Sequence, residues 1–209
     1  MRNLLPMELY TTSTSPFGLM ARIVILEKDL AERVQTIEAQ TRTVGSPYYE
    51  INPSGRVPYL ICDDGTGFEE TQLICAYLDH LVGQPSLGHP SGRDGWESRR
   101  LEALARSMLD GVSVWSRELT RVPHEQSPTI IAHETERARR MAETWEQEIM
   151  HPMMNGPLNM AQLTLAVTLN VEHLIDGFEI RGKCPNLSSW TTRVAQRPSF
   201  QQLLPDLEI

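Results

Sequence analysis

Two short stretches of the chain have residue types and spacing suited to holding a small peptide. In the first, Val57 precedes Pro58, which opens the apolar run 59–62; because proline cannot donate a ladder hydrogen bond, it belongs at the first residue of a strand. A cis bond there would leave the N–H and C=O groups of Val57 free to pair with a bound peptide, whereas a trans proline would simply start an edge strand. In the second, Glu70 and Thr71 precede apolar residues at helical spacing. Free N–H groups and the helix dipole attract a carboxylate at such a helix start.

The surrounding pattern predicts the elements that position these residues. Residues 63–67 read Asp-Asp-Gly-Thr-Gly, which is typical of a hairpin turn, so a strand, a turn, a short strand and a helix follow one another. Upstream, residues 7–11 alternate as a short strand does, and Pro16 fits the first position of a helix with Ser15 as its N-cap. Residues 33–39 are a weaker strand prediction that would complete a βαβ unit, and residues 47–51 form a short link.

The composite of these features resembles the thioredoxin-like domain of glutathione transferases. The family pattern is N-P-x-G-x-V-P-x-L, a short acidic hairpin, and then an acidic residue and Ser or Thr ahead of an I-x-x-Y-L helix. The residues that match it are Asn52, Pro53, Gly55, Val57, Pro58, Leu60, Glu70, Thr71, Ile74, Tyr77 and Leu78. The resemblance implies that Pro58 is a cis-proline, that the Val57 main chain pairs with the cysteinyl part of glutathione, and that Glu70 and Thr71 hold its γ-glutamyl end.

The resemblance also implies a residue that activates the thiol. In related families a Ser or Cys stands directly before the first helix, in patterns such as S-P-F with an Arg seven residues on, and Ser15-Pro16-Phe17 with Arg22 match this pattern. The thiolate is the nucleophile, and a helix N-terminus with a hydroxyl donor beside it stabilises that anion. Ser15 is therefore the candidate catalytic residue, with Thr14 and Ser13 as alternatives for a loop shifted by a residue. A role for Ser15 in capping alone stays open.

The reaction and its electrophile follow from the same resemblance. Serine rather than cysteine at position 15 favours conjugation to a hydrophobic electrophile, peroxide reduction or isomerisation over thiol–disulfide exchange. We expect the electrophile pocket between two domains, formed by Phe17 with Met108, Gly111 and Trp115; a plain inter-helix core role for Met108 and Trp115 is the alternative.

One departure from the family pattern leaves a second function open. Leu19 and Met20 stand where many bacterial relatives carry Arg-Lys, and Arg56 and Arg22 are candidates to replace the missing cations, with Arg56 and Phe17 expected near glutathione. Because glutathione is anionic, the lost cations also favour a different hypothesis. In that hypothesis the chain is a non-catalytic binding or regulatory protein with a transferase fold.

The domain organisation is predicted from a change in composition. Residues 83–95 contain Pro85, Pro90 and four glycines without periodicity. We expect a thioredoxin-like βαβ-ββα domain over residues 7–82, a linker over 83–95 and an all-helical domain over 96–209. Helices are predicted over 96–119, 128–150 and 163–175, the last opened by a capping box between Asn159 and Gln162, and residues 185–205 resemble the family's closing helices.

Charge and cysteine content limit which partners and which cellular compartment we expect. With 19 basic and 27 acidic residues in 209, the net charge is −8, which disfavours nucleic acid and anionic membranes as partners. The three cysteines form no disulfide framework and no apolar run could span a bilayer, so we expect a cytoplasmic protein. The histidines lack paired metal-ligand spacing, so no metal is expected. The resemblance implies a homodimer.

Overall fold

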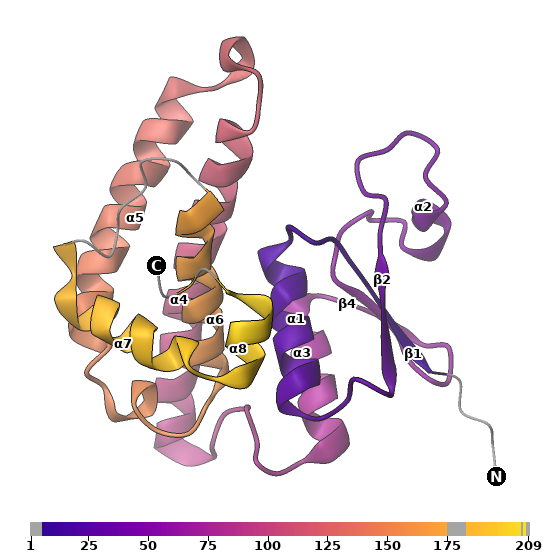
Figure 1. Cartoon of the computed structure of the whole chain (residues 1–209), viewed down its shortest axis with the longest axis horizontal. Helices are drawn as coiled ribbons and strands as arrows, with labels where there is room; N and C mark the ends of the chain where they lie inside the picture. Colours follow the sequence, from indigo (N-terminus) through magenta and orange to yellow (C-terminus); the bar gives the residue numbers. More distant parts are fainter. Residues whose placement is uncertain (1–5, 175–182, 206, 208–209) are drawn as a thin grey trace. The chain divides into compact units, whose positions relative to one another are not determined.

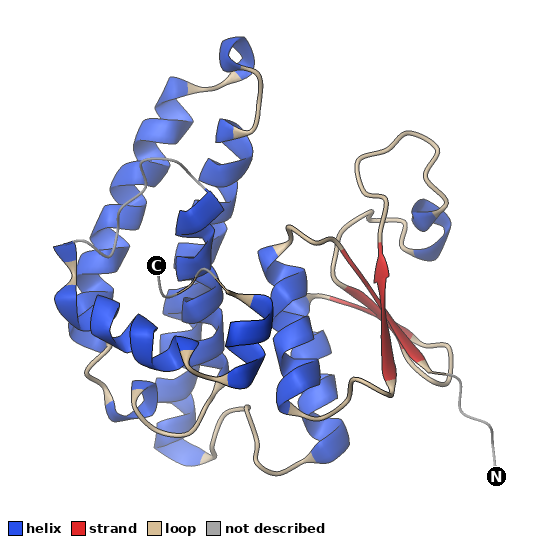
Figure 2. Cartoon of the chain, in the orientation of Figure 1, coloured by secondary structure: helices blue, strands red, loops and turns tan. Residues whose placement is uncertain are grey.

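The computed structural model describes residues 6–174, 183–205 and 207. The chain divides into two compact units, Met1–Ser86 and Leu87–Ile209. Figures 1 and 2 show that the described strands belong to the first unit, whereas the second is built from helices.

The first unit has the predicted order of strands and helices. Its elements are β1 (Met7–Thr11), α1 (Pro16–Glu27), β2 (Val34–Glu38), α2 (Tyr48–Ile51), β3 (Tyr59–Ile61), β4 (Gly67–Glu69) and α3 (Thr71–Val82). The described strands form one sheet in the order β2-β1-β3-β4, in which β1 and β2 are parallel and the other pairs are antiparallel. The thioredoxin-like βαβ-ββα prediction is therefore confirmed.

Burial alternates along β1, which explains why helices pack on one face of the sheet. Met7 and Leu9 are buried, whereas Glu8 and Tyr10 point to the opposite face and are only half-buried. In Figure 1, α1 and α3 lie side by side along one face of the sheet, and each contacts the strands. The apolar face of β1 has to be covered by helices, whereas the face that carries Glu8 and Tyr10 does not.

Gly18 is required where α1 passes close to β1. A Cβ at Gly18 would overlap the hydroxyl of Thr11, a residue that is 2 % exposed. We expect Gly18→Ala to lower the free energy of unfolding by about 1–3 kcal/mol, because the overlap must be relieved by moving α1 or Thr11. Thermal unfolding measures this change. Gly156→Ala is the control, since its Cβ would meet nothing closer than 3.5 Å; an equal loss in both variants would contradict the overlap.

A buried cation holds the end of the first unit in place. The Nζ of Lys28 lies 2.6 Å from Oδ1 of Asp79, with the Lys28 side chain only 1 % exposed. The same ammonium donates to the carbonyls of Gly83 and Pro85 at 2.9 and 2.5 Å. The Oδ2 of Asp79 accepts from the Ser86 hydroxyl at 2.9 Å. Lys28 therefore ties the C-terminal ends of α1 and α3 to the segment that leaves the unit.

The second unit is helical over the described residues. Its elements are α4 (Gly92–Leu119), η1 (Pro123–Glu125), α5 (Pro128–Glu148), η2 (Pro152–Met154), α6 (Met160–Asn170), η3 (Val171–Leu174), α7 (Pro185–Ala195) and α8 (Pro198–Leu203). The helix predicted over 96–119 in fact begins at Gly92, and the helix predicted over 128–150 ends at Glu148. The helix predicted over 163–175 begins at Met160 and gives way to a 3-10 turn after Asn170, while residue 175 lies outside the described residues.

The predicted capping box is only half correct. The Oδ1 of Asn159 accepts from the Gln162 N–H at 3.1 Å, as an N-cap should. The Gln162 side chain does not return the bond; its Nε2 donates to the carbonyls of Met153 and Gly156 at 2.9 and 3.3 Å. The preceding loop thus takes the donor that a capping box would direct at Asn159.

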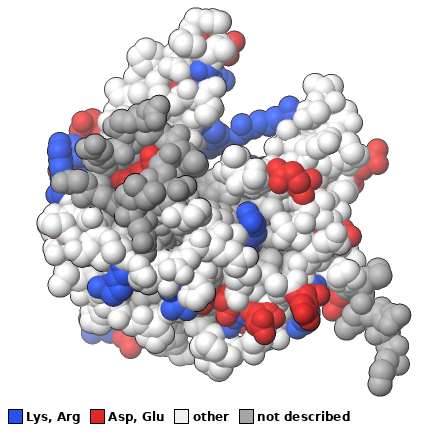
Figure 3. All heavy atoms as spheres, viewed as in Figure 1, with Lys and Arg blue, Asp and Glu red and all other residues white. Residues whose placement is uncertain are grey.

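Two further observations concern the described residues. Among the described residues, no helix combines the length and the apolar character needed to cross a bilayer. Acidic and basic side chains are interspersed on the face seen in Figure 3.

Candidate functional site

One row of paired residues across the sheet brings the predicted site segments to the same end of the sheet. Tyr10 pairs with Tyr59, and Tyr59 pairs with Glu69. Because β1 and β4 both run antiparallel to β3, the end of β1, the start of β3 and the end of β4 meet at one edge of the sheet. Ser15 follows β1, Val57 and Pro58 precede β3, and Glu70 follows β4.

The Val57-Pro58 bond is cis, as the family resemblance implies. Pro58 is buried and Val57 is half-buried, and strand pairing begins only at Tyr59. Within the described part of the chain, the N–H and C=O groups of Val57 make no hydrogen bond. An extended peptide could therefore pair with this main chain as an added strand would.

The turn ahead of Val57 is held by buried polar side chains. The Arg56 carbonyl accepts from the Tyr48 hydroxyl at 2.5 Å and from Nδ2 of Asn52 at 3.0 Å. Tyr48 and Asn52 are 3 % and 2 % exposed. Sequence reasoning placed Asn52 in the motif but missed Tyr48, whose partner lies eight residues away and is a carbonyl group that no residue pattern reports.

The residue directly before α3, Glu70, has an unusual backbone conformation. Glu70 is the N-cap, and its φ of 77° and ψ of 122° place a non-glycine residue in a sparsely populated region. The Glu70 carbonyl accepts from the Ile74 N–H at 3.0 Å, and the next residue, Thr71, is 4 % exposed. The N–H groups in the first turn of an α-helix lack intrahelical acceptors and favour an anionic ligand. This geometry suits a carboxylate near Glu70 and Thr71.

Ser15 caps α1 and keeps a proton that it can donate. Its Oγ accepts from the Gly18 N–H at 3.1 Å. A hydroxyl carries one donor as well as two acceptor lone pairs, so the capping bond leaves the O–H available to a thiolate. Capping and thiol activation are thus compatible in Ser15. The alternatives Thr14 and Ser13 are exposed, and Ser13 uses its main-chain N–H on Glu38 at 3.2 Å.

The cations proposed to replace the missing Arg-Lys pair differ in exposure. Met20 is fully buried, so of the two positions only Leu19, which is half-buried, reaches the surface of the unit. Arg56 is exposed and Arg22 is half-buried, and neither pairs with an acidic side chain among the described residues. Arg56 adjoins the Val57 main chain and is the better placed of the two to attract an anion.

The predicted electrophile-pocket residues lie in different units. Phe17 is half-buried at the second position of α1, whereas Met108, Gly111 and Trp115 belong to α4. Met108 and Trp115 are only 1 % and 7 % exposed. A Cβ on Gly111 would lie 2.5 Å from Oε2 of Glu134, so Gly111 faces α5. These contacts favour a core role for the α4 residues.

The cysteines are poorly placed for thiol–disulfide exchange. Cys62, Cys75 and Cys184 are all buried, and none forms a disulfide. Burial raises the pKa of the Cys62 thiol and that of the Cys184 thiol. Since the thiolate is the reactive form, both groups are held in the inert state. No cluster of metal-ligating side chains occurs among the residues that the structure describes.

Comparisons with known proteins agree with this geometry. Residues 9–86 match the family described as "Glutathione S-transferase, N-terminal domain". A glutathione transferase family member from Pseudomonas fluorescens, solved with bound glutathione, superposes with a TM-score of 0.85 at 23% identity, covering 94% of this chain and 98% of its own. A glutathione S-transferase from Rhodospirillum rubrum gives 0.80 at 26% identity, covering 96% and 92%.

A curated relative extends the match along the sequence. Glutathione S-transferase 2 of Saccharomyces cerevisiae is 26% identical over 212 aligned positions, which cover 95% of this chain and 89% of the relative. The family match covers the unit that holds Ser15, the Val57-Pro58 bond and Glu70, and the structural matches extend over both units. Together these findings show that residues 9–86 match the N-terminal domain of glutathione S-transferases and that the chain has the fold of the glutathione transferases with which it was compared.

Proposed function

We propose that this protein is a glutathione transferase that activates the thiol of glutathione through Ser15 and presents it to a hydrophobic electrophile. The observation that carries the proposal is the row Tyr10-Tyr59-Glu69. This row brings a capped helix start, the unpaired main chain of Val57 and a second helix start to one edge of the sheet. A tripeptide with a thiol at its centre and a carboxylate at each end suits such a set of groups.

Each group has a part in the proposed mechanism. The main chain of Val57 pairs with the cysteinyl residue, Glu70 and Thr71 bind the γ-glutamyl end, and Arg56 with Phe17 lies along the peptide. The Ser15 hydroxyl donates to the sulfur at the start of α1. The dipole contributes about 0.3–1 kcal/mol and a hydrogen bond to a charged group about 1.5–3 kcal/mol, which lowers the thiol pKa by about one to three units.

The stabilised thiolate then attacks the electrophile. In conjugation a sulfur–carbon bond forms and the leaving group departs with its electron pair; peroxide reduction and isomerisation use the same anion. A homodimer in the cytoplasm, as usual for such transferases, is part of the proposal. The relatives' bound glutathione supports the choice of thiol but not that of the electrophile.

Retention and turnover test the proposed function directly. The folded full chain is expected to bind immobilised glutathione, to be eluted by free glutathione, and to conjugate glutathione to a chlorodinitrobenzene. Isothermal titration with glutathione gives the affinity without relying on any one electrophile. Folded protein that neither binds glutathione in the titration nor turns over the nitroaromatic would refute the proposal.

A second candidate function keeps the transferase fold and loses the chemistry. Leu19 and the buried Met20 occupy the positions of a basic pair in many relatives, which favours a binding or regulatory protein with weak or no turnover. Under this alternative, the protein binds a partner or another small ligand, glutathione binding in the titration is weak or absent, and no electrophile is consumed. Ser15→Ala then leaves the biological activity unchanged.

A further inference from the structure

We infer that Tyr48 is a positioning residue for the bound peptide: its hydroxyl fixes the carbonyl of Arg56 and thereby the direction of the Val57 N–H. The inference rests on the proposed function, because it assigns Tyr48 a role in glutathione affinity. Tyr48 itself is 3 % exposed and need not touch the ligand.

The link between the two groups is covalent geometry. The Arg56 carbonyl and the Val57 N–H belong to a single planar peptide unit. A hydrogen bond that fixes the direction of the C=O therefore fixes the direction of the N–H as well. The bond from the Tyr48 hydroxyl to this carbonyl is 2.5 Å long, and the bond from Nδ2 of Asn52 is 3.0 Å. Two donors on one carbonyl leave the plane little freedom to rotate.

Asn52 alone does not secure this plane. Its Nδ2 is 3.4 Å from the Tyr48 hydroxyl as well as 3.0 Å from the Arg56 carbonyl, while its Oδ1 accepts from the Ser54 N–H at 3.2 Å. The main-chain N–H of Asn52 donates to the Tyr48 carbonyl at 2.9 Å. Tyr48 thus contacts both the carbonyl that is held and the amide that helps to hold it.

The turn is also joined to the other half of the proposed site. The Arg56 N–H donates to Oγ of Ser54 at 3.1 Å, and that hydroxyl donates to Oε1 of Glu69. Glu69 ends β4 and directly precedes Glu70, the N-cap of α3. The main chain that would face the cysteinyl residue is therefore linked through Ser54 to the segment that would face the γ-glutamyl end.

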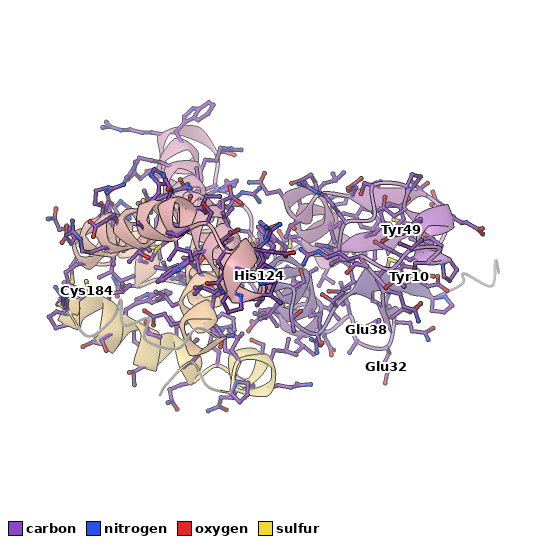
Figure 4. All side chains as sticks on the ribbon, turned by 90° about the horizontal axis from the view of Figure 1, so that it is seen from above. Tyr10, Glu32, Glu38, Tyr49, His124 and Cys184 are labelled. Carbon is purple, nitrogen blue, oxygen red and sulfur yellow. The ribbon has the colours of Figure 1, made fainter. Side chains whose placement is uncertain are left out.

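Neighbouring rings keep the Tyr48 hydroxyl in place. The Tyr48 ring lies 5.7 Å from the Tyr10 ring and 6.5 Å from the Tyr49 ring, both labelled in Figure 4. Tyr49 in turn packs beneath Gly55, where a Cβ would lie 2.8 Å from its ring. Burial raises the pKa of Tyr48, so the hydroxyl remains a donor throughout the neutral range.

Tyr48→Phe tests the inference, because it removes the hydroxyl and keeps the ring. We expect the dissociation constant and the KM for glutathione to rise about three- to tenfold, because one buried hydrogen bond is lost. The kcat and the KM for the electrophile should stay unchanged. Tyr10→Phe is the matched control, since that hydroxyl donates to Glu8 at 2.7 Å and not to the turn. The control should leave glutathione affinity within about twofold of the wild type.

Amide hydrogen exchange supplies a second measurement that needs no ligand. In Tyr48→Phe the amides of residues 54–57 should exchange faster than in the wild type and in Tyr10→Phe. Unchanged exchange, or a loss of glutathione affinity equal to that of the control, would overturn the positioning role. If the wild type itself fails to bind glutathione, the proposed function falls and takes the inference with it. The two failures are therefore distinguishable.

Discussion

Ser15→Ala is expected to lower the rate of conjugation at neutral pH by about 10- to 150-fold, the equivalent of one hydrogen bond to an anion. The loss arises because the thiol pKa rises when its donor is removed, so less thiolate is present. The variant should regain rate as the pH increases, and its pH–rate profile should shift upward by about one to two units. Steady-state kinetics over a range of pH measures both effects.

The control for Ser15 is a second serine with the same local structure. Ser127 caps α5, is followed by Pro128 and accepts from the Ile130 N–H at 3.4 Å, as Ser15 precedes Pro16 and accepts from Gly18. Losing such a cap costs about 0.5–2 kcal/mol of stability at either place. Ser127→Ala should show that loss with normal kinetics. Should both variants keep full activity, Ser15 acts only as a cap.

Lys28→Met is expected to produce the largest loss of stability, about 3–5 kcal/mol in the free energy of unfolding. The substitution removes the cation that lies 2.6 Å from Asp79 and the donor to the Gly83 and Pro85 carbonyls, all in a region where the Lys28 side chain is 1 % exposed. A buried carboxylate without its cation is strongly unfavourable. Chemical denaturation followed by circular dichroism measures the change.

Two further variants separate burial from charge pairing. Arg100 bridges Glu97 and Glu148 but is 45 % exposed, so Arg100→Met should cost no more than about 1 kcal/mol. Combining Lys28→Met with Asp79→Leu should recover much of the loss, because neither charge is then buried. A loss from Lys28→Met as small as that from Arg100→Met would show that the ammonium contributes little.

Local chemistry made much of the first unit predictable. A proline at the start of an apolar run, an acidic turn and a helix start follow one another along the chain. Each of these elements limits which element can come next. Pro16, directly after Ser15, likewise marked a helix start. The structure shows the N-cap that this pattern predicts, in which the Ser15 Oγ accepts from the Gly18 N–H. These features depend on residues close together in the chain, which a single sequence displays.

The missed features depend on contacts between distant residues or on main-chain groups. Gly92 and Gly95 were assigned to a linker, yet α4 begins at Gly92. Gly95 lies so close to the Pro90 carbonyl that a Cβ there would overlap it, a contact that the sequence does not display. The helical spacing of Gly111 could not show which neighbour it faces; the structure places it against Glu134. Tyr48 was assigned only to a link, because its partner is a carbonyl group.

The pairing of Tyr59 with both Tyr10 and Glu69 limits how the hairpin between β3 and β4 can change in length. Side chains alternate between faces along a strand, so an odd shift of β4 would turn Phe68 away from the Tyr77 ring that it meets edge-on at 4.9 Å. It would also move Glu70 from its place directly after the Tyr10-Tyr59-Glu69 row. Insertions or deletions in this hairpin should therefore be tolerated mainly at its tip, around residues 63–66, where the loop can bulge without moving either strand.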